Sequence, residues 1–240
     1  LSLDYDKVGD SQKAKIEAEK VLKLDKSNLW ASSFLLMIAE KTEDWEYAEL
    51  RAKNLLKLNG HGEKINLSRY TMQKGIDLLK NNNLNEADSL FRKAINDSPS
   101  YGLPYKYLGD IKHLNRDLVK AVENWGKYID LSPEENYKVF DRIETALFDL
   151  GRYSEVENFY RKILDANPND INAGQRLANV LNEKGENKAA LALVDQFIEY
   201  NELSISLMLM KLKLSLLTKT PTELGYYVDE ILNKLKNENN

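Results

Sequence analysis

Two histidines and many carboxylates are the side chains best able to do chemistry in this chain, and their spacing favours neither catalysis nor metal binding. His61 lies in a Gly-His-Gly turn, where we expect a solvated loop residue, and His113 follows 52 residues later. Two single histidines without cysteine or an HExxH spacing predict no metal site. The Walker loop, GxGxxG and GxSxG motifs are missing from the sequence as well. We therefore expect a protein that is not an enzyme and carries no cofactor.

Basic side chains fit a binding role better. Lys106, Arg142 and Arg176 fall in three successive segments of similar pattern and could present cations to an acidic segment or a free carboxylate of a partner. The alternative is an ordinary surface ion pair, in which Asp110, four residues after Lys106, or Asp141 neutralises the lysine. Both interpretations stay open at this point.

Composition limits the class of protein. With 240 residues and 42% hydrophobic content, the chain can bury a full core as one large or two small domains, and five prolines with 30% charge favour helix. A net charge of −4 argues against nucleic acid as the main ligand. The longest apolar run, Ile205 to Leu217, contains Lys211 and Lys213, so no segment reaches the ~18–20 apolar residues that span a bilayer. The lack of cysteine fits a reducing compartment.

An internal repeat organises the chain. At an offset of 34 residues, small, aromatic and breaker positions coincide, pairing Gly75 with Gly109, Ala87 with Ala121, Phe91 with Trp125, and Pro99 with Pro133. We expect the glycines and alanines to let two helices approach closely, the aromatic residues to fill the space between helical hairpins, and the prolines to end each unit. Periods of this length are typical of helical repeat arrays.

The pattern resembles the tetratricopeptide repeat, and its fullest match is Tyr105, Leu108-Gly109, Ala121, Trp125 and Pro133. The resemblance implies an all-α, right-handed superhelical solenoid of helical hairpins. We expect a single helical-repeat domain over 1–240, divided into a partial unit 1–28, units 29–62, 68–101, 102–135, 137–170 and 171–204, and a closing hairpin 203–236. Three positions depart from the pattern, namely Ala52, Lys74 and Val156. The period breaks at 63–67, where we expect the next first helix to be lengthened or reoriented.

In repeats of this type the first helices line a concave groove that binds protein partners. The resemblance therefore implies a partner-binding set on that face, consisting of Arg69, Lys106, Tyr107, Lys138, Arg142, Arg176 and Asn179. The similarity to chaperone-binding carboxylate clamps is partial, because Asp110 and Arg142 replace the clamp's asparagines. Protein partners, rather than nucleic acid or a membrane, are expected for this part of the chain.

The order of units also looks like the cytoplasmic repeat region of the bacterial lipopolysaccharide assembly protein B family. The residues that carry this resemblance are Leu58-Asn59-Gly60, the stretch Tyr70-Thr-Met-Gln-Lys-Gly-Ile-Asp-Leu-Leu, Leu84-Asn-Glu-Ala, and Leu147-Phe-Asp-Leu-Gly-Arg-Tyr. The resemblance implies a cytoplasmic adaptor that brings the lipid A deacetylase to a membrane protease. It also implies an inner-membrane anchor and a rubredoxin-like metal module outside these residues. Because the chain starts at Leu1 rather than Met, we expect a fragment of a longer protein. Two alternatives stay open, a generic scaffold in another bacterial assembly and a helper domain of a catalytic domain.

Overall fold

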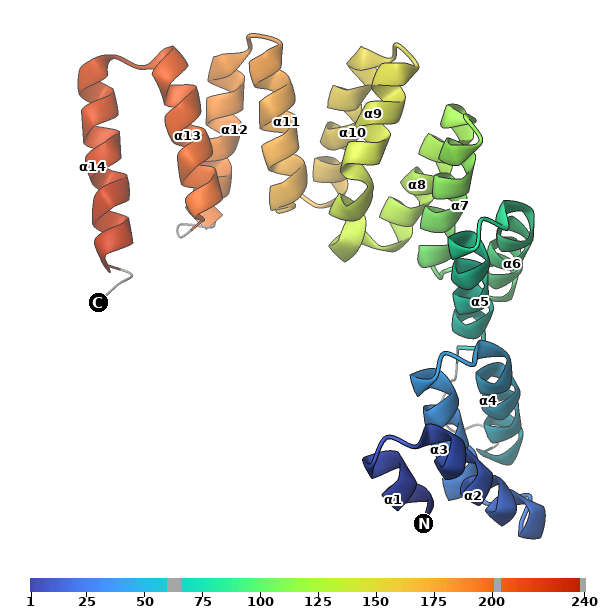
Figure 1. Cartoon of the computed structure of the whole chain (residues 1–240). Helices are drawn as coiled ribbons and strands as arrows, with labels where there is room; N and C mark the ends of the chain where they lie inside the picture. The colour runs from blue at the N-terminus through green and yellow to red at the C-terminus, as the bar shows by residue number, and fades with distance from the viewer. Residues whose placement is uncertain (60–65, 201–203, 238–240) are drawn as a thin grey trace. The chain divides into compact units, whose positions relative to one another are not determined.

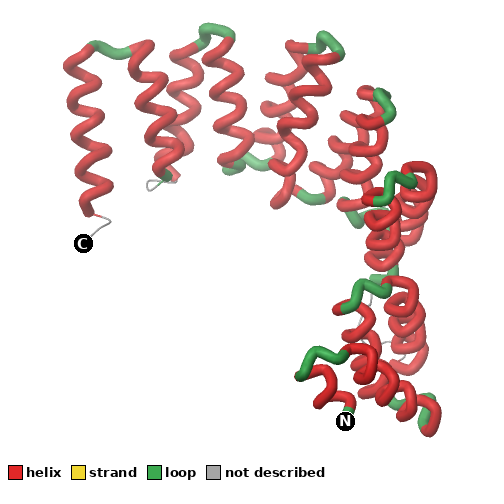
Figure 2. Tube along the Cα trace, in the orientation of Figure 1, coloured by secondary structure: helices red, strands yellow, loops and turns green. Residues whose placement is uncertain are grey.

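The computed structural model describes residues 1–59, 66–200 and 204–237, and within these ranges the regular elements are helices without strands (Figure 2). The chain folds as two compact units, Leu1–Val139 and Phe140–Asn240. The expected all-α class of antiparallel helical hairpins is confirmed, whereas the superhelical hand and the single domain stay predictions.

The first unit contains four helical pairs and a short 3-10 helix. In chain order, its elements are α1 (Ser2–Lys7), α2 (Ser11–Leu24), α3 (Leu29–Lys41), α4 (Trp45–Asn59), α5 (Ser68–Lys80), α6 (Leu84–Asp97), α7 (Leu103–Leu114), α8 (Leu118–Leu131) and η1 (Pro133–Val139) (Figure 1). α1 is the short first helix that the partial unit leads us to expect. The helices that pack most closely against each other are neighbours along the chain.

The second unit contains three helical pairs. Its elements are α9 (Phe140–Asp149), α10 (Tyr153–Ala166), α11 (Ile171–Glu183), α12 (Asn187–Tyr200), α13 (Ile205–Thr218) and α14 (Pro221–Asn237). The closing pair starts its second helix as expected, because Thr220 N–H donates to Glu223 Oε2 at 2.9 Å in a capping box and Pro221 is the first helical residue.

The turns inside the first six pairs follow one rule. Each takes three residues, and the middle residue has a left-handed backbone, with φ between 57° and 82°, at Gly9, Glu43, Asn82, Arg116, Gly151 and Gly185. A single left-handed residue ends the first helix and turns the chain back. The next residue often caps the second helix, as where Asp117 accepts a hydrogen bond from the backbone N–H of Lys120.

Aromatic rings hold the two helices of a pair together. A Cβ added at Gly75 would lie 2.6 Å from Phe91 Cε1, and one added at Gly109 would overlap the indole of Trp125. The glycine is therefore needed for an aromatic ring and not, as expected from the sequence, for close backbone approach. The ring of Phe91 also stacks on Tyr107 of the next pair at 5.3 Å, so this residue does fill the space between hairpins.

The second unit uses the same contact in a different register. A Cβ at Gly174 on α11 would overlap the ring of Phe197 on α12. This glycine lies one turn nearer the start of its helix than the 34-residue pattern predicts, where Ala178 occurs instead. Val156, which replaces the expected alanine on α10, is 1% exposed and packs in the core.

Two connections between pairs were expected to have particular structures, the one at Pro133 and the one at the period break 63–67. Pro133 does not simply end a unit, because it starts η1, and the first α-helix of the next pair begins only at Phe140. At the period break, α5 has 13 residues, as α3 has, so the following helix is not lengthened. Most of the break and the turn containing His61 lie outside the described residues, and a change of curvature there stays a prediction.

The glycine contact predicts opposite effects for two glycines of one hairpin. Gly109→Ala should lower the free energy of unfolding by ~1–3 kcal/mol, because Trp125 must move to make room. Gly126→Ala on α8 should raise it by ~0.5–1 kcal/mol, since nothing lies within 4 Å of the added Cβ and alanine is the better helix former. Denaturant unfolding measures both. Equal effects would show that the ring does not depend on the small residue.

Candidate functional site

Two of the candidate residues on α7 rest on the core. The amino group of Lys106 lies 4.8 Å from the centre of the Tyr107 ring, and that ring stacks on Phe91. Both side chains are half-buried. Tyr107 therefore packs against the core through one face of its ring, and Lys106 lies near the same ring.

Asp110, one turn after Lys106, has a structural partner. Its Oδ1 accepts the indole N–H of Trp125 at 3.0 Å. The carboxylate thereby satisfies the polar atom of a side chain that is 1% exposed. His113, on the same helix, lies against the same indole, with the ring centres 5.6 Å apart. Asp141 pairs with Arg176 at 2.5 Å.

Arg69 and Lys138 are committed to carboxylates of the protein. Arg69 pairs with Glu40, which also accepts the phenolic O–H of Tyr70 at 2.5 Å. Lys138, on η1, pairs with Glu135 at 2.6 Å, and this hydrogen bond raises the pKa of the lysine. A partner must compete with these contacts for either cation.

The candidates of the second unit lie on α9 and α11. Arg176 bonds to Asp141 at 2.5 Å and to Glu144 at 3.2 Å, so its charge is largely compensated. Arg142 and Asn179 are exposed. Asn179 lies three residues after Arg176, on the same face one turn along.

One arrangement recurs beneath these cations and was not predicted from the sequence. A buried aromatic side chain donates its polar hydrogen to a carboxylate, and the carboxylate pairs with a cation, as where Tyr160 donates to Glu144 Oε1 at 2.6 Å. Burial, with the hydrogen bond to Glu144 second, raises the pKa of Tyr160, so the phenol stays a donor. In the first unit, burial and Glu135 raise the pKa of Tyr128 to about 12. The arrangement fixes arginines such as Arg176 in place.

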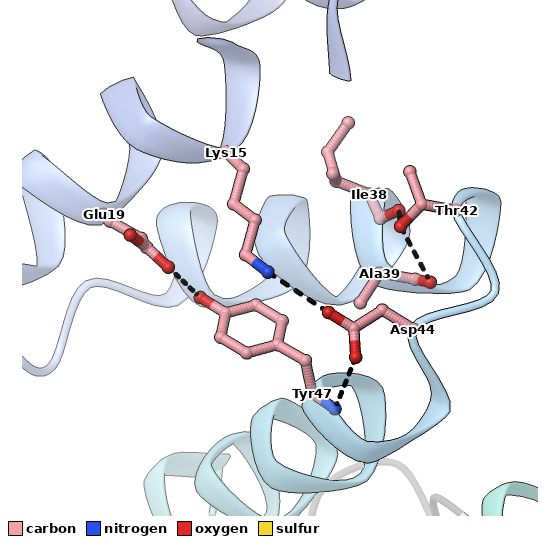
Figure 3. A network of polar contacts seen from close by, with 7 residues as sticks. All are labelled: Lys15, Glu19, Ile38, Ala39, Thr42, Asp44 and Tyr47. Carbon is pink, nitrogen blue, oxygen red and sulfur yellow. Dashed lines mark hydrogen bonds and ion pairs between the residues drawn. The ribbon is translucent and has the colours of Figure 1, made fainter. Parts of the chain in front are cut away.

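A tyrosine that donates to a carboxylate, with a cation beside it, also occurs between α2 and the next pair, α3–α4. The Tyr47 O–H donates to Glu19 at 2.6 Å, and Lys15 bonds to Asp44 at 3.2 Å while its amino group lies 3.7 Å from the Tyr47 ring centre (Figure 3). The close-up shows Lys15 and Glu19 reaching from one helix toward Tyr47 and Asp44 on the next pair (Figure 3). Polar contacts thus join successive pairs here.

A second type of polar contact joins the second helix of one pair to the next pair. Asp88 on α6 bonds to Lys112 at 2.6 Å and to Arg92 at 2.5 Å. Glu49 likewise pairs with both Lys53 and Lys74. Glu157 pairs with both Arg161 and Lys184. These clasps, each a carboxylate shared by two cations, occupy one repeat position. At that position α8 has Val122, and Gly126 follows where the other helices have a cation.

The described part of the chain has no group of three histidines or acidic residues placed to hold a metal ion. Among the same residues, no helix is both long and apolar enough to cross a membrane.

Comparison with known proteins gives structural similarities only. No protein-family model and no curated protein matches the chain. A crystal structure of MamA is 20% identical and covers 69% of this chain and 93% of its own, with a TM-score of 0.45. A structure of pilF from Pseudomonas aeruginosa is 15% identical and covers 85% and 89%, with a TM-score of 0.48. A double mutant of MamA RS-1 is 12% identical and covers 71% and 96%, also with a TM-score of 0.48. At these TM-scores the similarity carries no functional argument.

The class of the protein follows from its own residues. The chain is built from paired helices with a 34-residue offset, glycines under aromatic rings and fully buried alanines at Ala87 and Ala121. These features define a tetratricopeptide-like helical-repeat protein.

The clasp at Asp88 predicts a pH-dependent contribution to stability. Burial alone would raise the pKa of Asp88, but the hydrogen bonds from Lys112 and Arg92 outweigh it and lower the pKa below the ordinary value of 3.8. A carboxylate with a lowered pKa stabilises the fold above its unfolded pKa and loses that effect as the pH falls through its folded pKa. Asp88→Asn should therefore cost ~1 kcal/mol near pH 7 and progressively less below pH 3.8.

The control for this experiment is Asp97→Asn on the same helix, where the carboxylate is exposed and pairs with no described cation. This variant should match the wild type at pH 7 in chemical denaturation. A cost for Asp88→Asn that stays constant down to low pH would contradict the ionic origin of the effect.

Proposed function

We propose that this chain is a non-enzymatic scaffold that binds protein partners through the exposed polar side chains of its first helices. The observation that supports the proposal most directly is the contrast along α9 and α11. Ala146 and Ala178 are fully buried, whereas Arg142 and Asn179, on the same two helices, are exposed. Polar groups held on packed helices can bind a segment of a partner without first being ordered.

The cations of this surface would contribute unequally. Arg69 and Arg176 already pair with carboxylates, so an acidic partner gains only the difference between the new ion pair and the one it displaces. Arg142 is an exposed cation of the second unit's candidate set, and we propose it as a contact for an acidic segment. Lys106, Tyr107 and Lys138 would form the corresponding surface of the first unit. The chain's net charge of −4 supports proteins over nucleic acid as partners.

A finer proposal comes from the sequence resemblance to the lipopolysaccharide assembly protein B family. In this proposal the chain is the cytoplasmic part of an adaptor that links the lipid A deacetylase to a membrane protease and so limits lipopolysaccharide synthesis. Its support is the order of repeat units in the sequence, and none of the comparisons adds to it. Binding of purified lipid A deacetylase to the chain would test it directly, and no binding would leave the general scaffold, or a helper role beside a catalytic domain, as the better proposal.

Charge reversal at Arg142 tests the general proposal. Arg142→Glu should weaken binding of the chain's protein partner by about tenfold or more, and raising the salt concentration should reduce the difference, because exposed charges are screened over ~8–10 Å. Reversal of Arg176 is less informative, since it would place a third negative charge beside Asp141 and Glu144.

The matched control is Lys162→Glu on α10, which reverses one exposed charge on the second helix of the same pair. Partners captured from cells by the tagged chain are identified first, and their affinities are then measured by calorimetry. Equal affinity of the wild type, Arg142→Glu and Lys162→Glu would place binding outside the first-helix faces.

A further inference from the structure

A cleft of about 500 Å³ opens in the first unit between α2 and α4, and Ser32 of α3 is also part of its lining. Its walls come mainly from α2 and α4, the second helices of two successive pairs, with the connector between α2 and α3 at one end. None of the candidate residues discussed above lines it. Its size is in the range that holds a small ligand or a few side chains of a peptide.

Four cations line this cleft without an ion pair. Lys23, Lys26, Arg51 and Lys57 pair with no carboxylate in the described part of the chain. Their neighbours behave differently, since Lys20 bonds to Glu17 at 2.6 Å and Lys53 pairs with Glu49. In a chain whose surface cations are mostly compensated, a group of uncompensated ones in one cleft is a local positive field.

Arg51 is held in place at the wall of the cleft. Its guanidinium lies 4.6 Å from the centre of the Tyr47 ring, and its Nε–H is buried without a hydrogen-bond partner among the described residues. The aromatic face helps to orient the guanidinium, which also interacts electrostatically with the phenol of Tyr47. The planar N–H donors of a guanidinium suit a carboxylate.

The one carboxylate that lines the cleft has another contact. Glu19 accepts the O–H of Tyr47 at 2.6 Å, and the nearby Lys15 is bonded to Asp44 (Figure 3). Among the described residues, Glu19 makes no ion pair with the four cations. The lining therefore keeps an excess of three positive charges, on a chain whose net charge is −4.

We infer that this cleft is a second protein-binding site, which takes a short acidic segment with an apolar residue among its carboxylates. The inference rests on the proposed role as a protein-binding scaffold and adds a site on the second helices. The cations come from α2, the following connector and α4, so they suit an extended ligand that passes over several segments better than one compact anion. Leu22 and Leu58 offer apolar contacts beside the charges.

The test uses the full chain and a fluorescein-labelled peptide rich in Glu with Leu between the acidic residues, measured by fluorescence anisotropy. The wild type should bind it saturably and should not bind the counterpart in which every Glu is Gln. Lys23→Glu combined with Lys57→Glu should weaken binding about tenfold or more. Both lysines are exposed, so the double variant should keep the wild-type circular dichroism spectrum.

The matched control is Lys7→Glu combined with Lys93→Glu, which changes the net charge equally at exposed positions outside the cleft and should leave the affinity within about twofold of the wild type. Equal losses in both double variants would overturn the proposal, because the peptide would then respond only to overall charge. No saturable peptide binding would overturn it too. So would binding of pyrophosphate without the peptide, which would identify a site for compact phosphates.

Arg142→Glu separates this inference from the proposed function. Because Arg142 does not line the cleft, the loss of peptide affinity caused by the cleft double variant should be the same whether residue 142 is Arg or Glu. If Arg142→Glu weakens peptide binding and the cleft variant does not, the first-helix faces bind acidic segments and the cleft proposal is wrong. If the cleft variant alone weakens it, the cleft site stands whatever the outcome for the first-helix faces.

Discussion

The contact between an aromatic ring and a glycine is the interaction on which each of the best-formed hairpins depends. It requires an aromatic ring on the second helix and a glycine on the first helix. The turn must bring these two positions opposite each other. In α5–α6 and α7–α8 the two residues are 16 apart, whereas Gly174 and Phe197 are 23 apart. The larger separation is what antiparallel helices require, because a contact one turn farther from the hairpin turn adds three or four residues on each side. The first six pairs all have a three-residue turn, so the separation between two facing residues depends only on how far they lie from that turn.

This relation explains what the sequence could predict. An offset of 34 residues identifies contacts that occur at the same position in successive units. It therefore identifies the glycines at 75 and 109 and the aromatic residues at 91 and 125. It misses Gly174 because the contact moved along the hairpin. The carboxylate of Glu144 was missed as well, although it precedes Tyr160 by the same 16 residues that separate a glycine from its ring. A search for residues opposite each other across the turn would have found it. Glu40, whose partners Arg69 and Tyr70 belong to the next pair, could not be found in this way, since the packing between pairs has no fixed offset.

Electrostatics divides the surface into two kinds of region. Cations on most of the described helices pair with a carboxylate, and some pairs, such as Arg176 with Glu144, are partly shielded from water. Interactions of this kind lose less of their strength to salt than fully exposed pairs do. The cleft between α2 and α4 differs because its lysines have no such partners among the described residues. Because these lysines make no ion pair within the described part of the chain, their charges can interact with an acidic partner.

The lengths of the connections have a consequence for engineering. Reversals within the first six pairs always take three residues with a left-handed residue in the middle, whereas connectors between pairs range from four residues, as at 25–28, to eight, as at 132–139. Extra residues in a reversal would shift one helix against the other and pull each ring off its glycine. The connectors already vary in length, so the cost of further residues there is mainly that of closing a longer loop, which grows slowly. An epitope tag or a reporter domain therefore belongs in a connector such as 98–102, where the hairpins on either side keep their own registers.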